Sequence, residues 1–227
     1  EYKENPDKFV EIIIEEMLPI IVEKELATFC DVFCEEGVFT IEQSRKILLG
    51  AKKLGMGLKI HADEIKPLGG AELAAELGCI SADHLVAASD GGIKQMAERG
   101  VIANLLPGTS FNLQTGKFAN ARKMVELGVP IAISTDYNPG SCPTENLQLI
   151  MSFASLIMKL TPEEVITGVT INGAASLGIE ESHGSLQEGK KADIVIFDSP
   201  NLEYIIYHFG INHTHSVIKN GKIVYKN

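Results

Sequence analysis

The sequence predicts an α/β fold, a partial TIM-type (β/α) barrel followed by the strands of a small β-sandwich domain. Three observations predict it. Short apolar runs alternate with amphipathic segments, a pattern typical of a parallel sheet whose strands are joined by helices. Several of these runs end in polar side chains such as His61 and Asp136, as strands do at the carboxyl face of a barrel. From Gly184 the chain becomes polar and rich in turn residues before two further strand patterns.

The first half of the chain alternates between helix and strand patterns. Residues 7–24 form an amphipathic helix pattern that Pro19 should break or bend. Residues 27–34 are rich in aromatic and β-prone side chains, and Thr40 begins a helix to residue 54 with a sequence that resembles a capping box. The same reasoning predicts, in order, a strand at 57–61, a helix at 70–77, a short strand ending in 81–84 and a helix at 90–99.

The second half continues the alternation up to residue 172. We predict a strand at 101–106, a helix at 120–127, a strand at 129–136 and helices at 144–160 and 161–172. The pattern contains five strand–helix units. A closed barrel needs about eight strands, so the chain should supply roughly the last five eighths of one.

The tail predicts a separate small β-domain, which sets the expected domains at residues 1–183 and 184–227. Its strand patterns lie at 194–197 and 215–225, and the second contains Asn220-Gly221, a strong signal for a two-residue hairpin. So few strands cannot bury a sheet face on both sides. We therefore expect another segment to supply the remaining strands of a composite β-domain.

Composition limits the classes of partner. The chain has 227 residues, a formal net charge of −10 and a pI near 5.1, which argues against nucleic acid or an anionic membrane surface. No apolar run reaches the ~18 residues of a membrane span. The first residues do not have the pattern of a signal peptide and include no initiator Met, so we expect a fragment of a longer protein.

The four cysteines are expected to be ordinary buried thiols. They are scattered in mostly apolar surroundings, and the spacing of Cys30 and Cys34 is not the usual zinc spacing. Unpaired, buried thiols are typical of a reducing compartment, which favours a cytoplasmic protein. The full set is Cys30, Cys34, Cys79 and Cys142.

A chemical signal accompanies the strand pattern. His61 and Asp136 each end an apolar run, and Glu64 follows His61 by three residues. A His and a carboxylate at the carboxyl ends of parallel strands indicate a metal-assisted hydrolase. An Asp buried after such a run would be costly without a cation to compensate it.

Several motifs together resemble the amidohydrolase superfamily and, more narrowly, the imidazolonepropionases of histidine degradation. The resemblance covers essentially the whole chain. Its glycine-rich element after residue 183 is common and weak, whereas the motifs around His61 and Asp136 are narrower. The motifs are His61-Ala-Asp-Glu64, Ser81-Ala-Asp-His84, Leu106-Pro-Gly-Thr109, Ser134-Thr-Asp-Tyr-Asn-Pro-Gly-Ser-Cys142 and Gly184-Ser-Leu-Gln-Glu-Gly-Lys-Lys-Ala-Asp-Ile-Val195.

The resemblance implies a set of site residues and one divalent ion, zinc or iron. His61 and Asp136 would be metal ligands, and Asp136 would also accept a proton from water. Glu64 would contact the substrate ring and move protons, and His84 would stabilise an oxyanion or relay a proton. The loop residues that would bind substrate and product are Asn138, Gly140 and Ser141. The family's His-x-His pair and its residues for the substrate carboxylate have no counterpart here.

One motif imitates the missing pair. His213-Thr214-His215 has the spacing of a metal-binding His pair, but it lies in the tail. The family's pair precedes the barrel strands seen here. We therefore interpret His213 and His215 as structural.

The resemblance implies hydrolysis of a cyclic amide, the conversion of 4-imidazolone-5-propanoate to N-formimidoyl-L-glutamate. The expected partner is a small-molecule substrate, with no nucleic acid and no membrane, and the resemblance suggests a homodimer. The fragment alone should be inactive. Two alternatives stay open at this stage: a sibling amidohydrolase or deaminase acting on a heterocyclic base, and a non-catalytic half-barrel module.

Overall fold

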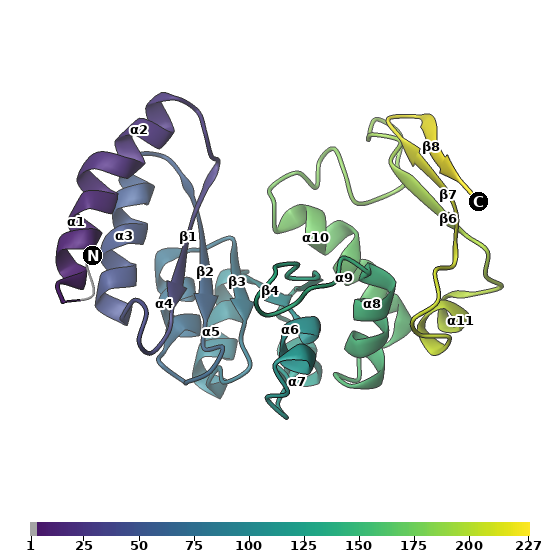
Figure 1. Ribbon diagram of the computed structural model, residues 1–227, viewed down its shortest axis with the longest axis horizontal. Helices are drawn as coiled ribbons and strands as arrows, with labels where there is room; N and C mark the ends of the chain where they lie inside the picture. The colour runs from purple at the N-terminus through teal and green to yellow at the C-terminus, as the bar shows by residue number, and fades with distance from the viewer. Residues whose placement is uncertain (1–3) are drawn as a thin grey trace. The chain divides into compact units, whose positions relative to one another are not determined.

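Parallel strands alternate with helices along most of the chain, as the sequence predicts (Figure 1). The computed structural model describes residues 4–227. The larger sheet has the strand order β1-β2-β3-β4-β5, and a smaller antiparallel sheet has the order β6-β7-β8. The chain forms two compact units, Glu1–Ala103 with Glu126–Pro130 and Asn104–Val125 with Ile131–Asn227. The predicted boundary between residues 183 and 184 stays a prediction.

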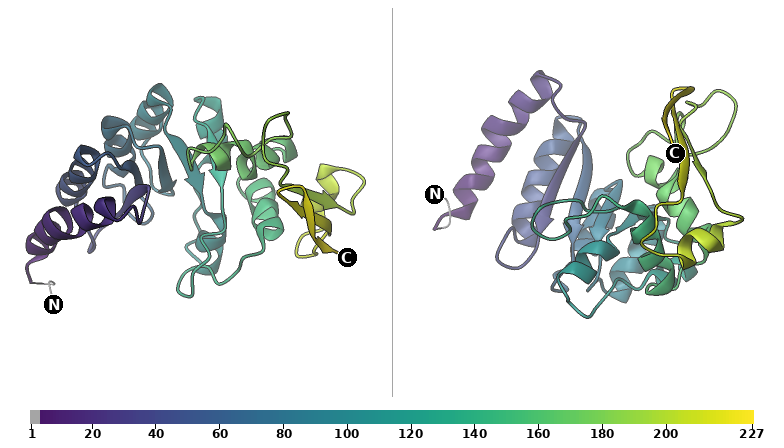
Figure 2. Two further views of the ribbon diagram at one scale, coloured as in Figure 1. Left: turned by 90° about the horizontal axis from the view of Figure 1, so that it is seen from above. Right: turned by 45° about the vertical axis from the view of Figure 1, so that its right-hand side comes forward.

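The first unit begins with a helical segment in which a π-helical turn interrupts the α-helix. The α-helices α1 (Pro6–Ile12) and α2 (Leu18–Glu23) are joined by a π-helical turn, η1 (Ile13–Met17). Pro19 has no N–H to donate to the preceding turn, so the regular ladder cannot run through it, and the predicted distortion takes the form of a wider turn. The two views of Figure 2 and Figure 1 agree that these helices lie beside α3.

The remaining elements of the first unit lie close to their predicted positions. A capping box between Thr40 and Gln43 begins α3, as expected. Helices α4 and α5 end at glycines in the left-handed region, Gly78 and Gly100. The elements are β1 (Phe29–Cys34), α3 (Ile41–Lys53), β2 (Gly57–Ala62), α4 (Gly70–Leu77), β3 (Ser81–His84) and α5 (Asp90–Arg99), and β4 (Ile102–Leu105) contains the boundary to the second unit.

The register of the first strands places His61 in one row of the sheet with Phe33 and Asp83. Strands β1 and β2 pair in parallel with Phe33 beside His61, and β2 pairs with β3 so that His61 lies beside Asp83. Side chains alternate between the two faces of a strand, so the neighbours of His61 within β2 point the other way. These neighbours, Ile60 and Ala62, are fully buried in the core with α4.

The second unit departs more from the sequence expectations. Strand β5 is shorter than predicted because Pro130 cannot donate to the ladder and the regular strand ends at Ile133, followed by one long hydrogen bond from the N–H of Ser134 to Leu105 at 3.3 Å. The predicted helix 161–172 breaks at Thr170, whose backbone is not helical, although its capping box of Thr161 and Glu164 is present. The elements are the unpredicted α6 (Pro107–Asn112), α7 (Ala121–Glu126), β5 (Ile131–Ile133), α8 (Leu147–Leu156), α9 (Pro162–Val169) and α10 (Ile171–Ala175).

The tail forms a three-stranded sheet with one helix. Asn220 and Gly221 both have positive φ angles, 50° and 75°, and they turn the chain between β7 and β8 as predicted. Every residue of β8 is exposed, so this sheet leaves an apolar edge open. The elements are β6 (Ile194–Phe197), the unpredicted α11 (Leu202–Tyr207), β7 (Thr214–Lys219) and β8 (Lys222–Lys226).

Within residues 4–227, every helix is too short or too polar to cross a membrane.

The cysteines behave as predicted, since all four are buried and unpaired. Burial raises the pKa of the Cys79 thiol to about 12 and that of Cys30 to about 11. A thiol in an apolar setting resists ionisation because the thiolate would lose its hydration. Neither cysteine should therefore act as a nucleophile near neutral pH.

Cys79 should make the folded chain sensitive to alkaline pH. Its folded pKa lies above the unfolded value of about 9.0, so its stabilising contribution is complete below pH 9 and is lost as the pH rises toward 12. Each pH unit in that window costs about 1.4 kcal/mol of unfolding free energy. Denaturant unfolding at pH 7.5, 9 and 10 should give a shallower decline for Cys79→Ala than for the unsubstituted chain. Parallel declines would contradict the assignment.

Candidate active site

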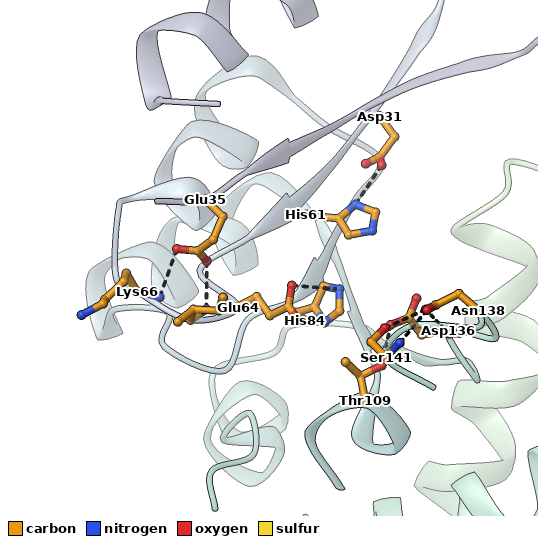
Figure 3. A network of polar contacts seen from close by, with 11 residues as sticks. Asp31, Glu35, His61, Glu64, Lys66, His84, Thr109, Asp136, Asn138 and Ser141 are labelled. Atoms are coloured by element: carbon orange, nitrogen blue, oxygen red, sulfur yellow. Dashed lines mark hydrogen bonds and ion pairs between the residues drawn. The ribbon is translucent and has the colours of Figure 1, made fainter. Parts of the chain in front are cut away.

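His61 lies at the carboxyl end of β2 with a carboxylate against one ring nitrogen. Its Nδ1 atom is 2.8 Å from a carboxylate oxygen of Asp31, which comes from the neighbouring β1 (Figure 3). The ring also makes an edge contact with Phe33. A carboxylate at Nδ1 favours the tautomer that carries its proton there, and this leaves Nε2 as the atom with a lone pair. The side chain is 29% exposed, so the ring is neither sealed in the core nor fully solvated.

His84 and Glu64 form a second pair in the same unit. His84 ends β3 and is 4% exposed, and its ring centroid is 5.2 Å from that of His61. The Nε2 atom of His84 is 3.7 Å from Oε2 of Glu64, whose side chain is 15% exposed (Figure 3). This distance is longer than a hydrogen bond, but both side chains are largely shielded from water, so the imidazole and the carboxylate are close enough to act on one bound group. The structure thus brings together three of the residues that the sequence predicts: His61, Glu64 and His84.

The loop that carries Glu64 is held by two buried carboxylates. Glu35, at the end of β1, accepts the backbone N–H groups of Ile65 and Lys66 at 2.8 and 3.2 Å. Asp63 accepts those of Gly69, Gly70 and Ala71 at 2.9 to 3.1 Å, and so begins α4. Both carboxylates are at most 1% exposed, and backbone donors compensate for their burial.

In the second unit, Asp136 follows β5 and is held by a threonine. The hydroxyl of Thr109 donates a hydrogen bond to Oδ2 of Asp136. Thr109 is 2% exposed and belongs to the short α6, which follows β4. One carboxylate oxygen of Asp136 is thereby oriented while the other stays available to a ligand.

The residues predicted to bind substrate form one tight turn after Asp136. Asn138 accepts the backbone N–H groups of Gly140 and Ser141 at 2.9 and 2.7 Å, and its amide donates to the Asp136 carbonyl and to the Ser141 hydroxyl at 2.8 and 2.7 Å (Figure 3). The Asn138 side chain therefore shapes the turn. The hydroxyl of Ser141 accepts that bond and keeps its own hydrogen for a ligand.

Backbone strain accompanies these positions. Asp63, His84 and Asp136 have φ angles of 50°, 72° and 54°, a region that costs non-glycine residues energy. Each lies where a strand of the large sheet has just ended or is ending. Strain of this kind persists where surrounding contacts over-determine the backbone, and it often marks functional positions.

The two tail histidines do not form a pair. His213 is buried, and its ring contacts Tyr204 and lies 3.2 Å from the carbonyl oxygen of His208. His215 is exposed on β7. Throughout residues 4–227, no three His, Cys, Asp or Glu side chains are grouped so as to hold a metal ion, and the structural role of His213 and His215 stays a prediction.

The comparisons with known proteins identify the family. The model of the amidohydrolase family matches residues 14–224. The chain belongs to the amidohydrolase family.

Curated relatives with high identity to this chain share one name. The chain is 66% identical over 224 residues to the imidazolonepropionase of Alkaliphilus oremlandii and 64% identical over 224 residues to that of Alkaliphilus metalliredigens. Each alignment covers 99% of this chain and 53% of the relative. The chain thus spans about half the length of the curated relatives that it matches.

Solved structures agree on the fold. An adenosine deaminase from Xanthomonas campestris with bound zinc has a TM-score of 0.68 at 23% identity, covering 82% of this chain and 49% of that one. An ochratoxinase from A. niger has a TM-score of 0.74 at 21% identity, covering 94% and 55%. At these identities the structural similarity supports the partial-barrel fold, whereas the chemistry must be inferred from the site residues.

The residues present fit part of a metal site. His61 has a carboxylate at Nδ1 and a lone pair at Nε2, the arrangement that metal-binding histidines generally have. Asp136 has one oxygen oriented by Thr109. These are two suitable donors, whereas a catalytic zinc usually has three protein ligands and a water. That His61 and Asp136 meet at one ion stays a prediction.

Three contributors to the site escaped the sequence analysis. Asp31 lies on a strand recognised only by its β-prone residues, Glu35 directly follows that strand, and Thr109 lies in a motif noted only for its likeness to the family. A signal existed for Asp31, because a lone carboxylate inside an apolar strand is costly unless it has a partner.

Proposed function

We propose that the chain is part of an imidazolonepropionase, a hydrolase that converts 4-imidazolone-5-propanoate to N-formimidoyl-L-glutamate. The observation that supports it most directly is the pairing of His84 with Glu64 beside His61, in a chain 66% identical to an enzyme of that name. In the reaction, water adds to the ring carbonyl carbon, the ring C–N bond breaks, and the released nitrogen takes a proton.

Glu64 and His84 would manage the proton and the charge on the substrate. The carboxylate of Glu64 can take a proton and later return it to the leaving nitrogen. His84, 3.7 Å away, can donate to the carbonyl oxygen as negative charge develops there. Their low exposure strengthens both interactions because little water screens them.

His61 and Asp136 would hold one divalent cation, zinc or iron. When bound, such a cation lowers the pKa of a water and polarises a carbonyl. Asp31 would keep the lone pair of His61 Nε2 directed at the ligand position, and Thr109 would keep Asp136 in one rotamer. Asp136 would also accept a proton from the attacking water.

The turn after Asp136 would bind the substrate and product through its backbone and the Ser141 hydroxyl. Asn138 is engaged within the turn, so its contribution would be to fix the positions of Gly140 and Ser141. We also propose a cytoplasmic enzyme, which four buried free thiols support, and a homodimer, which light scattering on the purified protein would test.

The proposed function is tested in a chimera. The chain replaces the matching 53% of the Alkaliphilus oremlandii enzyme, whose own remainder supplies what this chain lacks. We expect the chimera to consume 4-imidazolone-5-propanoate with kcat within about tenfold of the intact relative. Adenosine and cytosine serve as control substrates and should not be deaminated. Loss of imidazolone turnover in a folded chimera, or deamination of a control, would refute the proposal.

A further inference from the structure

The loop between β2 and α4 is fixed without much side-chain packing. Glu64 is followed by Ile65, which is 64% exposed, and by Lys66, which is exposed as well. Neither side chain can hold the loop through buried apolar contact. Glu64 lies between β2 and these two residues, yet its side chain points toward the buried His84. Something other than packing must set the course of this backbone.

Glu35 supplies that constraint through hydrogen bonds to the backbone. Its Oε2 accepts from the N–H of Ile65 at 2.8 Å, and its Oε1 accepts from those of Lys66 and Glu36 at 3.2 and 2.9 Å. Glu35 is 1% exposed, so these three donors replace water around the carboxylate. The two bonds to the loop act on the first residues after Glu64 (Figure 3).

Asp63 holds the loop on the other side of Glu64, but it has a second task. It also accepts the three N–H groups at the start of α4, and its own carbonyl accepts from Ala87 at 2.7 Å. Loss of Asp63 would therefore disturb a whole helix. Within the part of the chain that the structure describes, Glu35 accepts hydrogen bonds from the loop residues Ile65 and Lys66 and from its neighbour Glu36, so its loss should affect the loop without removing the cap of α4.

We propose that Glu35 is a positioning residue, which holds Glu64 against His84 by anchoring the backbone of Ile65 and Lys66. The proposal rests on the proposed function of Glu64. The hydrogen bonds that its carboxylate accepts come from the backbone of Ile65, Lys66 and Glu36, so Glu35 would act on the reacting groups through the loop. A Gln at this position would place an amide NH2 where a carboxylate oxygen now accepts, so at least one of the three N–H groups would face another donor.

The first test measures the anchor itself in the 227-residue chain. Amide hydrogen exchange at Ile65 and Lys66 should be about tenfold or more faster in Glu35→Gln than in the unsubstituted chain. Glu36→Gln is the matched control, because its exposed carboxylate makes only a long ion pair with Lys66, at 3.9 Å. If Glu35→Gln does not fold, Glu35→Asp keeps the charge and shortens the reach. Unchanged exchange at both amides in a folded variant would overturn the proposal.

The second test is a double-mutant cycle in the chimera. Glu35→Gln should lower kcat by about tenfold to a hundredfold, the usual effect of misplacing a reacting group, and should change KM little. In a Glu64→Gln background the same substitution should cost less than about twofold, because there is no longer a carboxylate to position. Equal losses in both backgrounds would mean that Glu35 serves only stability.

The outcomes separate this proposal from the proposed function. A folded chimera without imidazolone turnover refutes the function, whereas the exchange experiment still decides whether Glu35 anchors the loop. If the turnover rate of the Glu64→Gln chimera is too low to detect, the NMR chemical shifts of the His84 ring serve as the readout in place of kcat. Glu35→Gln should then move them in the direction that Glu64→Gln does, and unmoved resonances would overturn the proposal.

Discussion

Asp136→Asn in the chimera is expected to lower kcat/KM by about a thousandfold or more, as loss of a group central to the chemistry commonly does. An amide keeps the shape of the side chain but has one oxygen and no negative charge. It would weaken a cation site and could not accept a proton from water. The measurement is imidazolone turnover together with bound zinc or iron per chain. Turnover within tenfold of the unsubstituted chimera would contradict the assignment.

We expect Thr109→Val to reduce activity less than Asp136→Asn does. Such a loss would show that the Asp136 carboxylate must be oriented as well as present. Valine has nearly the shape of threonine but cannot donate to the Asp136 carboxylate, so we expect a loss of about tenfold to a hundredfold in activity or metal affinity. Thr115→Val is the matched control. It makes the same chemical change in an exposed loop, where the hydroxyl bonds only to backbone groups of neighbouring residues.

The order of elements could be predicted because local chemistry decides it. Thr40 and Gln43 form their capping box, and Asn220-Gly221 forms its hairpin, since both signals lie within a few residues. Strand ends were harder to place. The predicted strand 129–136 extends beyond the regular ladder, which ends at Ile133, because the polar residues 134–136 follow the apolar residues without a local signal that marks where pairing stops.

Helices shorter than two turns were missed for a related reason. Pro107–Asn112 and Leu202–Tyr207 have six residues each, too few to show a helical period. Their first turns are nevertheless favourable, with Pro107 at the start of one and Asn201 capping the other. Such segments are helical in the fold because tertiary contacts support them, as when the carbonyl of Ile206 accepts from Ser152 at 3.0 Å.

Some residues of the candidate site could be predicted from the sequence and others could not. His61 and Asp136 could be found because each ends an apolar run and lies in a narrow motif, and His84 because it ends a strand pattern in a motif that resembles the family. Glu35 could not, because its partners Ile65 and Lys66 are 30 and 31 residues away in sequence and offer only backbone N–H groups, which every residue but proline has. Positioning groups that act on backbone leave no complementary side chain to recognise.

The 227-residue chain alone is expected to show no measurable imidazolone hydrolysis. It contributes two of the ligands expected for one ion, and residues 4–227 contain no group of three candidate ligands. Binding by two donors is weak, so a chromophoric chelator should strip zinc from the chain at concentrations that leave the chimera loaded. The sequence also has no counterpart of the family's residues for the substrate carboxylate, and lost positioning by itself costs orders of magnitude in rate.

The tail sheet gives this prediction a structural readout that does not depend on activity. Its strand β8 is exposed along its whole length, with Ile223 at 65% and Val224 at 62% exposure. An open apolar edge of this kind pairs with other chains, so the chain alone should self-associate as its concentration rises.

Co-expression with the unmatched part of the Alkaliphilus oremlandii enzyme tests the cause of both the missing turnover and the self-association. A second chain that completes the ligands and covers the edge should restore turnover and suppress self-association together. Turnover by the isolated chain at a rate near that of the chimera would contradict the prediction. It would mean that residues interpreted here as structural, such as His213 and His215, complete the site.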